Sequence, residues 1–221
     1  TGDIAFQSLA HDVKDIRCHP DGPYRVFAAT GGGLFRSVNS GSTSTNIMPG
    51  DILEIEFHPL NPDTIYTVRR SGPVTEFFRS LNGGNSFVQM TAGWPSPNVG
   101  AGEHQERTEI AVTPDAPNNI YALATGSANG GSGLYGIYIS ADLSANWTFT
   151  CCGPGPGGPP SPTNQNLMGW SDQGLDDGGQ YYYDLAFAVS PFNKDSMWVC
   201  GVNLWVSANE GSSFVCPAAW S

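Results

Sequence analysis

Short runs of alternating apolar and polar residues recur along the whole chain, and clusters of turn residues separate them. Representative runs read VFAAT, IEFHP, IYAL and FAVSP. A period of two is typical of strands that bury one face, whereas few stretches carry apolar residues at the spacing of an amphipathic helix. The pattern therefore predicts an all-β chain built from short strands.

One block of sequence occurs four times. Each copy has a strand that ends in proline, an aromatic residue seven positions later, and then a Ser-x-Asx-x-Gly segment, named the box turn below. The seven-residue steps run from Pro20 to Phe27, Pro59 to Tyr66, Pro114 to Tyr121 and Pro191 to Trp198. We name these four aromatics the step-seven aromatics and expect them to be buried. Four antiparallel strands per copy predict one blade of a β-propeller, in which blades stack around an axis to bury their large residues.

The box turns are expected to connect the third and fourth strands of each blade. Ser and Asx side chains can hydrogen-bond their own turn, and Gly accepts a positive φ. The four turns, with the aromatic that closes three of them, consist of Ser37, Asn39 and Gly41; Ser80, Asn82, Gly84 and Phe87; Ser140, Asp142 and Trp147; and Ser207, Asn209, Gly211 and Phe214. Asn occupies three of the four Asx positions, and a cation site would favour carboxylates. The motif is therefore interpreted as a folding staple, with no metal and no cofactor.

These turns resemble the Asp-box, or bacterial neuraminidase repeat, of sialidases, sortilin-type domains and xyloglucanase-like propellers. Residues 178–214, GGQYYYDLAFAVSPFNKDSMWVCGVNLWVSANEGSSF, look most like large secreted bacterial propeller proteins, many of which carry a type IX secretion sorting domain. The resemblance implies a secreted or cell-surface bacterial protein. Members of this group generally have seven or more blades, so the resemblance also implies that the four blades here are a fragment of a larger propeller. A closed four-bladed ring is the alternative.

The repeat divides the chain into segments of a single partial propeller over residues 1–221. Residues 1–10 are expected to form a strand of a preceding or closing blade. The four blades are expected at residues 11–48, 49–93, 94–152 and 184–221, with an insertion at 153–183.

Composition and charge exclude two classes of binding partner. With 39% hydrophobic residues the chain can form a core, and it contains no apolar run long enough for a membrane helix, so no membrane insertion is expected. A formal net charge of −11 repels phosphate backbones, which makes nucleic acid an unsuitable partner.

The five cysteines lack the spacing of a zinc site. Adjacent Cys151 and Cys152 could bond to each other only through a strained ring, so we expect ordinary thiols or one long-range disulfide instead. Cys200 and Cys216 fall on the second and fourth strands of the last blade. Because a strand separates them, we expect no bond between these two.

Candidate binding residues lie near or within two long excursions, at 88–108 and 151–183, because loops on rigid scaffolds often carry function. The second contains a Pro- and Gly-rich arm at 153–162. The candidates are Trp94, Trp170, Tyr181 and Tyr182, which could stack on sugars, and the acids Asp172, Asp176 and Asp177. Packing between blades and simple solvation of the acids are the alternatives.

No catalytic residue is assigned. The chain has no Gly-x-Ser-x-Gly nucleophile elbow and no arginine-rich sialidase pattern, and a glycosidase needs two carboxylates at a defined separation. The sequence favours a non-catalytic propeller module that binds a protein or a glycan at the cell surface, or the remainder of its own propeller. The alternative is a fragment of a xyloglucanase-like glycoside hydrolase.

Overall fold

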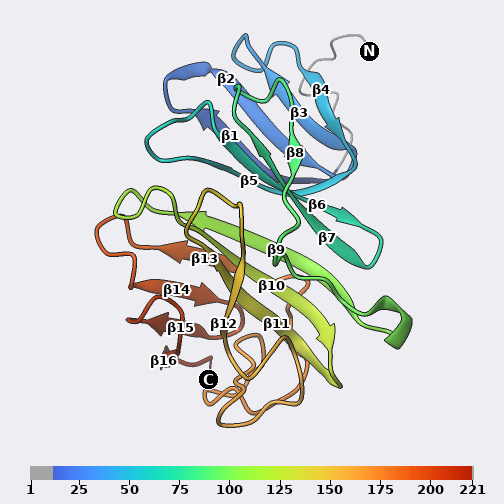
Figure 1. Cartoon of the computed structure of the whole chain (residues 1–221), viewed down its shortest axis with the longest axis vertical. Coiled ribbons are helices and arrows are strands. Elements are labelled where there is room, and N and C mark those ends of the chain that lie inside the picture. Colours follow the sequence, from blue (N-terminus) through green and yellow to red (C-terminus); the bar gives the residue numbers. More distant parts are fainter. Residues whose placement is uncertain (1–11, 221) are drawn as a thin grey trace. The chain divides into compact units, whose positions relative to one another are not determined.

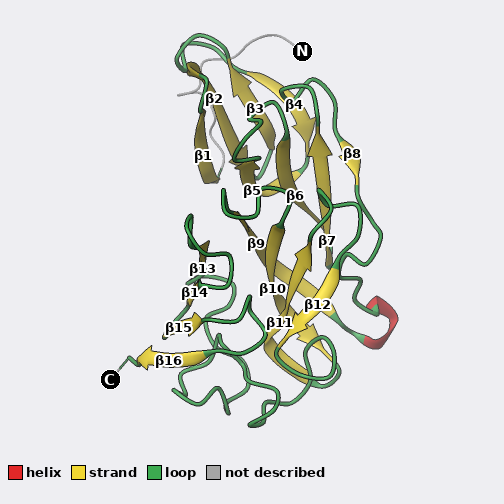
Figure 2. Cartoon of the chain, turned by 60° about the vertical axis from the view of Figure 1, so that its left-hand side comes forward, coloured by secondary structure: helices red, strands yellow, loops and turns green. Residues whose placement is uncertain are grey.

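The computed structural model describes residues 12–220 and is all-β, as the alternating pattern predicts (Figures 1 and 2). The described strands form four four-stranded sheets, and in each sheet consecutive strands are neighbours. This arrangement confirms the predicted propeller class with four blades. A short 3-10 turn, η2 (Val99–Ala101), lies in the excursion at 88–108, between the second and third sheets. The strand expected at residues 1–10 lies outside the described residues.

The four sheets are named blades I to IV in chain order. Blade I contains β1 (Val13–His19), β2 (Gly22–Thr30), β3 (Gly33–Ser37) and β4 (Thr45–Pro49). Blade II contains β5 (Asp51–Phe57), β6 (Ile65–Ser71), β7 (Val74–Ser80) and β8 (Val88–Gln89). Blade III contains β9 (His104–Val112), β10 (Ile120–Ala128), β11 (Gly131–Ser140) and β12 (Thr148–Cys151). Blade IV contains β13 (Ala186–Val189), β14 (Met197–Cys200), β15 (Leu204–Ser207) and β16 (Val215–Ala218).

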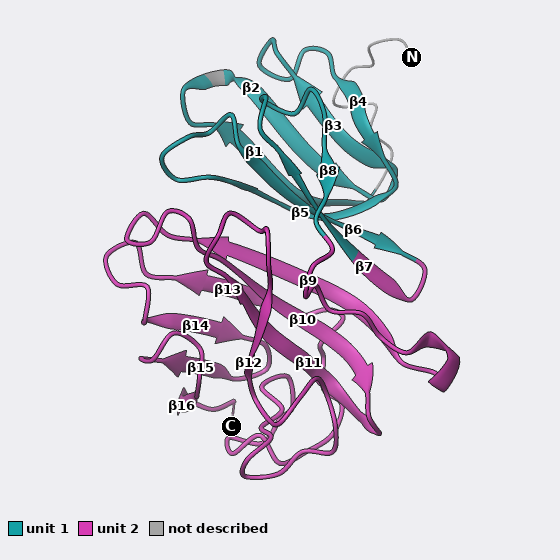
Figure 3. Ribbon diagram, in the orientation of Figure 1, with its two compact units in different colours: residues 1–71, 76–90 teal, residues 72–75, 91–221 magenta. Residues whose placement is uncertain are grey.

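The chain divides into two compact units, shown in two colours in Figure 3. The first comprises residues 1–71 and 76–90, and the second comprises residues 72–75 and 91–221. Blade I and most of blade II belong to the first unit, and blades III and IV belong to the second.

In the first unit, the core lies between blades I and II. Phe27 and Leu34 of blade I form one cluster with Ile55 and Phe57 of blade II. The rings of Phe27 and Phe57 meet edge to face with centroids 5.5 Å apart, a favourable aromatic geometry. Apolar side chains that alternate along β2 and β5 therefore meet at this interface.

The second unit has a core of the same kind between blades III and IV. Tyr121 and Ile137 of blade III pack in one cluster with Met197, Val199 and Trp205 of blade IV. All five side chains are completely buried. The insertion after β12 adds further apolar side chains to this cluster, so it is part of the core of the unit.

The four box turns share one hydrogen-bond pattern. In each turn the Ser hydroxyl donates to the Asx Oδ1 over 2.8–3.0 Å and accepts the backbone N–H four residues later over 2.9–3.0 Å. The Asx Oδ1 in turn accepts the N–H of the residue four positions after it. In the third turn Ser144 replaces the glycine and still adopts a φ of 66°. Side-chain oxygens thus hold the link between the third and fourth strands of every blade.

Burial of the step-seven aromatics is not uniform. Phe27, Tyr66 and Tyr121 have an exposed fraction of 0%, whereas Trp198 is 38% exposed. The expectation that all four are buried is therefore wrong for Trp198. Its side chain lies on the face of blade IV that points away from blade III, because its neighbours Met197 and Val199 occupy the face in the core.

Replacing Tyr121 by alanine should cost about 3–5 kcal/mol of unfolding free energy, since it removes a fully buried ring. Trp198→Ala should cost roughly half of that or less, because water already reaches its ring. Urea unfolding followed by circular dichroism measures both values. Equal losses would show that Trp198 is buried in solution.

Candidate functional site

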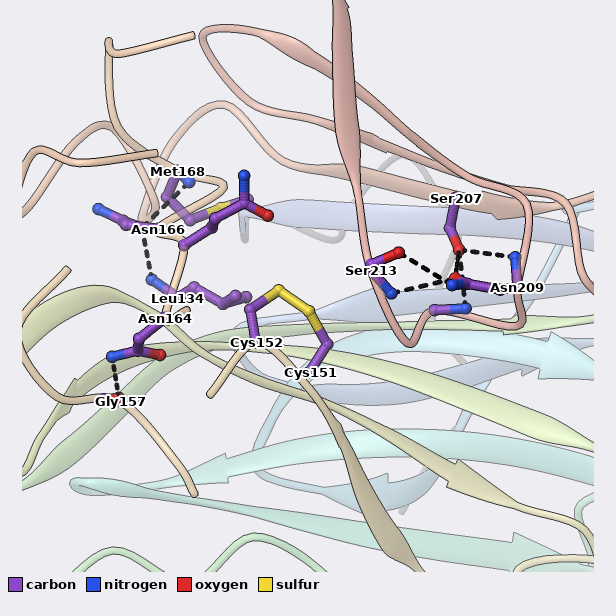
Figure 4. The surroundings of a disulfide bond; sticks show 12 residues. Leu134, Cys151, Cys152, Gly157, Asn164, Asn166, Met168, Ser207, Asn209 and Ser213 are labelled. Atoms are coloured by element: carbon purple, nitrogen blue, oxygen red, sulfur yellow. Dashed lines mark hydrogen bonds between the residues drawn. A yellow bond between two sulfur atoms is a disulfide. The ribbon is translucent and has the colours of Figure 1, made fainter. Parts of the chain in front are cut away.

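The long insertion after β12 is organised around the buried amide of Asn166. Its Oδ1 accepts the backbone N–H of Leu134 over 2.9 Å and that of Met168 over 3.1 Å (Figure 4). Its Nδ2 donates to the carbonyls of Asp176 and Gly178 over 2.9 and 2.8 Å. One side chain therefore ties β11 to two separate parts of the insertion.

The Pro- and Gly-rich arm packs on the β10–β11 hairpin. Gly157 donates its N–H to the carbonyl of Tyr135 over 2.8 Å, and Gly158 donates to that of Ala128 over 2.9 Å. Asn164 Nδ2 donates to the carbonyl of Gly157 over 3.0 Å. The arm is irregular, as its composition predicts, but it is hydrogen-bonded to the sheet instead of projecting from it.

Cys151 and Cys152 form a disulfide with each other (Figure 4). The expectation of free thiols or a long-range bridge is therefore wrong for this pair. Cys151 is the last residue of β12, and its side chain lies in the core cluster. Cys152 lies beyond the end of the strand, so its side chain is not forced to the opposite face of the sheet. It packs against the same cluster. Cys200 and Cys216 are free thiols, which confirms that they do not bond to each other across β15.

Two of the predicted acids hold backbone amides. Asp176 accepts the N–H of Trp170 over 2.6 Å and that of Ser171 over 3.0 Å, and Asp177 accepts the N–H of Ser132 over 2.6 Å. Asp172 is exposed and lines a separate hollow of about 310 Å³ beside β15 and β16. The three acids therefore do not converge on one point.

The predicted aromatics also differ in their surroundings. Trp94 is 8% exposed, donates its Nε1–H to the carbonyl of Thr75 over 2.8 Å and meets Trp147 edge to face at 4.8 Å. It is a packing residue, so it is no longer a candidate for sugar stacking. Trp170 and Tyr182 are exposed.

Tyr181 lies between the core cluster and the surface. Its ring packs against that cluster and meets Tyr182 edge to face at 5.8 Å. Burial raises the pKa of the Tyr181 hydroxyl, and the negative charges of Glu106 and Asp177 raise it further. Tyr181 therefore stays protonated and can donate a hydrogen bond at neutral pH.

The two excursions meet at a hollow of about 550 Å³ on the second unit, at the end of the β10–β11 hairpin. We name it the polar hollow. Its polar side chains come from the first excursion, the hairpin and the insertion, and they are Asn98, Glu103, Ser127, Asn129, Ser132 and Asp177. A second hollow of about 450 Å³ adjoins it at Asn129 and is lined by the Pro- and Gly-rich arm.

Glu103 and Asn129 fix the shape of the polar hollow. The carboxylate of Glu103 accepts the N–H of Asn98 over 2.7 Å and that of Asn129 over 3.1 Å. These two bonds lower the pKa of Glu103 below its usual value, so it is anionic at neutral pH. Asn129 and Gly130 have φ angles of 51° and 81°, which an Asn-Gly hairpin turn provides.

Of the residues lining the polar hollow, only Asp177 was predicted from the sequence to be a binding residue. The Asn129-Gly130 pair between two alternating runs was a readable hairpin signal, and it lies at the rim. The contributions of Asn98, Ser127 and Ser132 had no signal in the sequence, because their meeting depends on how the two excursions fold back.

None of the helices in the described part of the chain is long and apolar enough to cross a membrane. Among residues 12–220, no three or more His, Cys, Asp or Glu side chains are grouped so that they could hold a metal ion.

No family model matches the sequence, and no curated protein matches it. Solved propeller structures are similar in fold. A GH74 enzyme from Niastella koreensis is 18% identical with a TM-score of 0.59, and the match covers 95% of this chain and 30% of that one. The GH74 xyloglucanase from Xanthomonas campestris is 15% identical with a TM-score of 0.60, covering 94% and 30%.

A third structure, a candidate TolB from Agrobacterium tumefaciens, is 13% identical with a TM-score of 0.55, and the match covers 95% of this chain and 63% of that one. The chain thus spans about a third of the two GH74 enzymes in length. At these identities the similarity shows the fold, a β-propeller.

The carboxyl group of Glu103 should titrate below its ordinary value of about 4.3. The pKa of Glu103 is lower in the folded protein than in the unfolded chain, so its carboxylate stabilises the loop fully above the unfolded pKa. This stabilisation is lost as the pH falls through the folded pKa. Carbon-detected NMR of the side chain measures the midpoint. Asn98→Pro, which suits the local φ of −78°, removes one donor and should move the midpoint back up. An unchanged midpoint would show that the N–H of Asn98 does not lower the pKa of Glu103.

Asn166→Ala should destabilise the second unit by roughly 2–4 kcal/mol, since it leaves several buried backbone groups without partners. Asn164→Ala is the matched control: its amide is half-buried and serves the arm alone, so its loss should be smaller. Urea unfolding measures both. A larger loss for Asn164→Ala would place the organising residue in the arm.

Proposed function

We propose that this chain is a non-catalytic β-propeller module of the Asp-box class, belonging to a secreted or cell-surface bacterial protein, and that it binds a glycan in the polar hollow. The observation that carries the proposal is the convergence of six hydrogen-bonding side chains from three separate segments on one hollow. Concave sites of about 300–1,000 Å³ with a few convergent polar groups are typical of ligand sites. The polar hollow, at about 550 Å³, falls within that range.

The chemistry of the lining suits a ligand rich in hydroxyl groups. Carboxylates accept hydrogen bonds, amides both donate and accept, and hydroxyls do either. Asp177 uses one carboxylate oxygen for the N–H of Ser132, and its other oxygen can accept from a sugar hydroxyl. The exposed ring of Tyr182 offers a face for stacking, and it meets the ring of Tyr181, whose pKa is raised in part by the charge of Asp177.

The lowered pKa of Glu103 favours binding over hydrolysis. A glycosidase requires a general acid whose pKa is raised, so that it holds a proton at the working pH. Glu103 has a lowered pKa because two backbone amides stabilise its anion. Its geometry supports an acceptor role toward hydroxyl groups.

The test is calorimetric binding of soluble oligosaccharides, with xyloglucan oligosaccharides in the panel. Asp177→Asn keeps an oxygen for the N–H of Ser132 but removes the charge, so affinity should fall roughly tenfold or more. Asp172→Asn is the matched control, because Asp172 lies at a different hollow and should leave affinity unchanged.

Equal affinities of the Asp177→Asn and Asp172→Asn variants would show that the ligand does not bind in the polar hollow. Failure of every oligosaccharide to bind would favour a protein ligand. Release of reducing ends from a polysaccharide, lost in Asp177→Asn with the fold intact, would instead support the alternative of a glycoside hydrolase fragment.

A further inference from the structure

A separate hollow of about 270 Å³ on the second unit is lined by the disulfide. Cys151 is 1% exposed and Cys152 is half-buried. The other lining side chains come from the end of β12, the insertion and the box turn of blade IV, and they are Thr150, Pro162, Thr163, Gln165, Ser212 and Ser213. None of the described residues that line this hollow is charged. We name it the disulfide hollow.

The bond between Cys151 and Cys152 contributes little as a staple of the chain. A disulfide stabilises a fold mainly by closing a loop in the unfolded chain, and its effect grows with the length of that loop. The two cysteines are neighbours in the sequence, so their bond encloses no intervening residue. The bond instead holds two sulfur atoms together in the lining of the hollow, where β12 ends and the insertion begins.

This lining suits a neutral aromatic ring. Sulfur is polarisable, and its contacts with aromatic rings are favourable. The exposed ring of Pro162 adds a further apolar surface to the lining. Because no charged side chain is present to pair with an ion, desolvation disfavours a charged ligand. The volume of about 270 Å³ is just below the range of about 300–1,000 Å³ for larger ligands, so it matches a single ring.

Two polar side chains of the lining can hydrogen-bond a hydroxyl group on such a ring. Ser213 Oγ accepts the Nδ2–H of Asn209 over 2.9 Å, which leaves its own hydroxyl hydrogen free to donate (Figure 4). Gln165 donates its Nε2–H to the carbonyl of Gln173 over 3.3 Å, which leaves its Oε1 free to accept. A phenol both accepts and donates, so it complements this pair.

We propose that the disulfide hollow is a second ligand site and that it binds a neutral phenol, supplied by a small phenolic compound or by the tyrosine side chain of a peptide. The ring packs on the sulfur atoms of Cys151 and Cys152 and on Pro162. The hydroxyl group hydrogen-bonds with Ser213 and Gln165. The disulfide hollow shares no lining residue with the polar hollow, so this site is independent of the proposed glycan site.

The test is an NMR titration of the full chain with p-cresol, which has the structure of a tyrosine side chain. At neutral pH it is uncharged, because its pKa is about 10. The amide signals of Gly153, Thr163 and Ser213 should shift on binding. The control compound is 4-methylcyclohexanol, which keeps the hydroxyl group but has no aromatic ring. It should bind at least roughly threefold more weakly, since it lacks the contacts between ring and sulfur.

The role of the bond is tested in the double variant Cys151→Ala/Cys152→Ala and, with every side chain kept, by reducing the wild-type chain. In both cases the affinity for p-cresol should fall roughly threefold to tenfold, and reoxidation should restore it in the wild type. Cys216→Ala is the matched control. Cys216 packs against the same core cluster but lines the hollow beside Asp172, so its loss should leave the affinity unchanged. Circular dichroism verifies the fold in each state.

The source of the phenol is distinguished by N-acetyltyrosinamide. If it binds as tightly as p-cresol, the ligand is a tyrosine side chain; if only p-cresol binds, the ligand is a small phenol.

Equal affinities of p-cresol and 4-methylcyclohexanol would overturn the proposal, as would an unchanged affinity after reduction. Tighter binding of methyl glucoside than of p-cresol at the same amide signals would replace the phenol by a sugar. Asp177→Asn should leave the affinity for p-cresol unchanged, so the outcome here is separate from that of the glycan proposal.

Discussion

Each blade carries large apolar residues on both faces of a four-stranded sheet, and the rest of the structure depends on covering them. A single sheet of this kind cannot bury both faces by itself. Phe27 of blade I is buried with Phe57 of blade II, and Tyr121 of blade III is buried with Trp205 of blade IV. In blade IV the equivalent residue, Trp198, is 38% exposed.

The box turn links this packing to the local sequence. Its Ser and Asx oxygens satisfy the turn's own N–H groups, which fixes a short connection between the third and fourth strands. A fixed connection can also contact the preceding blade, as Glu210 does with Tyr121. The staple inside one blade thus contributes to the interface between two blades.

Hydrogen bonds from side chains to backbone groups also shape the candidate site. Asn166 satisfies buried backbone groups of the insertion, and Glu103 and Asp177 accept backbone N–H groups at the rim of the polar hollow. Irregular backbone has no ladder to pair with, so its N–H and carbonyl groups need side-chain partners. Those side chains hold the loops in place, and Glu103 and Asp177 also line the polar hollow.

The all-β class, the four blades and the box turns could be predicted from the amino-acid sequence, because strand alternation, Pro and Gly positions and Ser-Asx turns act over a few residues. Tertiary structure alone decided that Trp94 is buried against Trp147, that Cys152 turns to the same cluster as Cys151, and that Trp198 is exposed. It also decided which side chains of the two excursions meet at Asn129. These outcomes depend on which sheet or loop packs against which, and residues far apart in the sequence carry no local pattern that reports it.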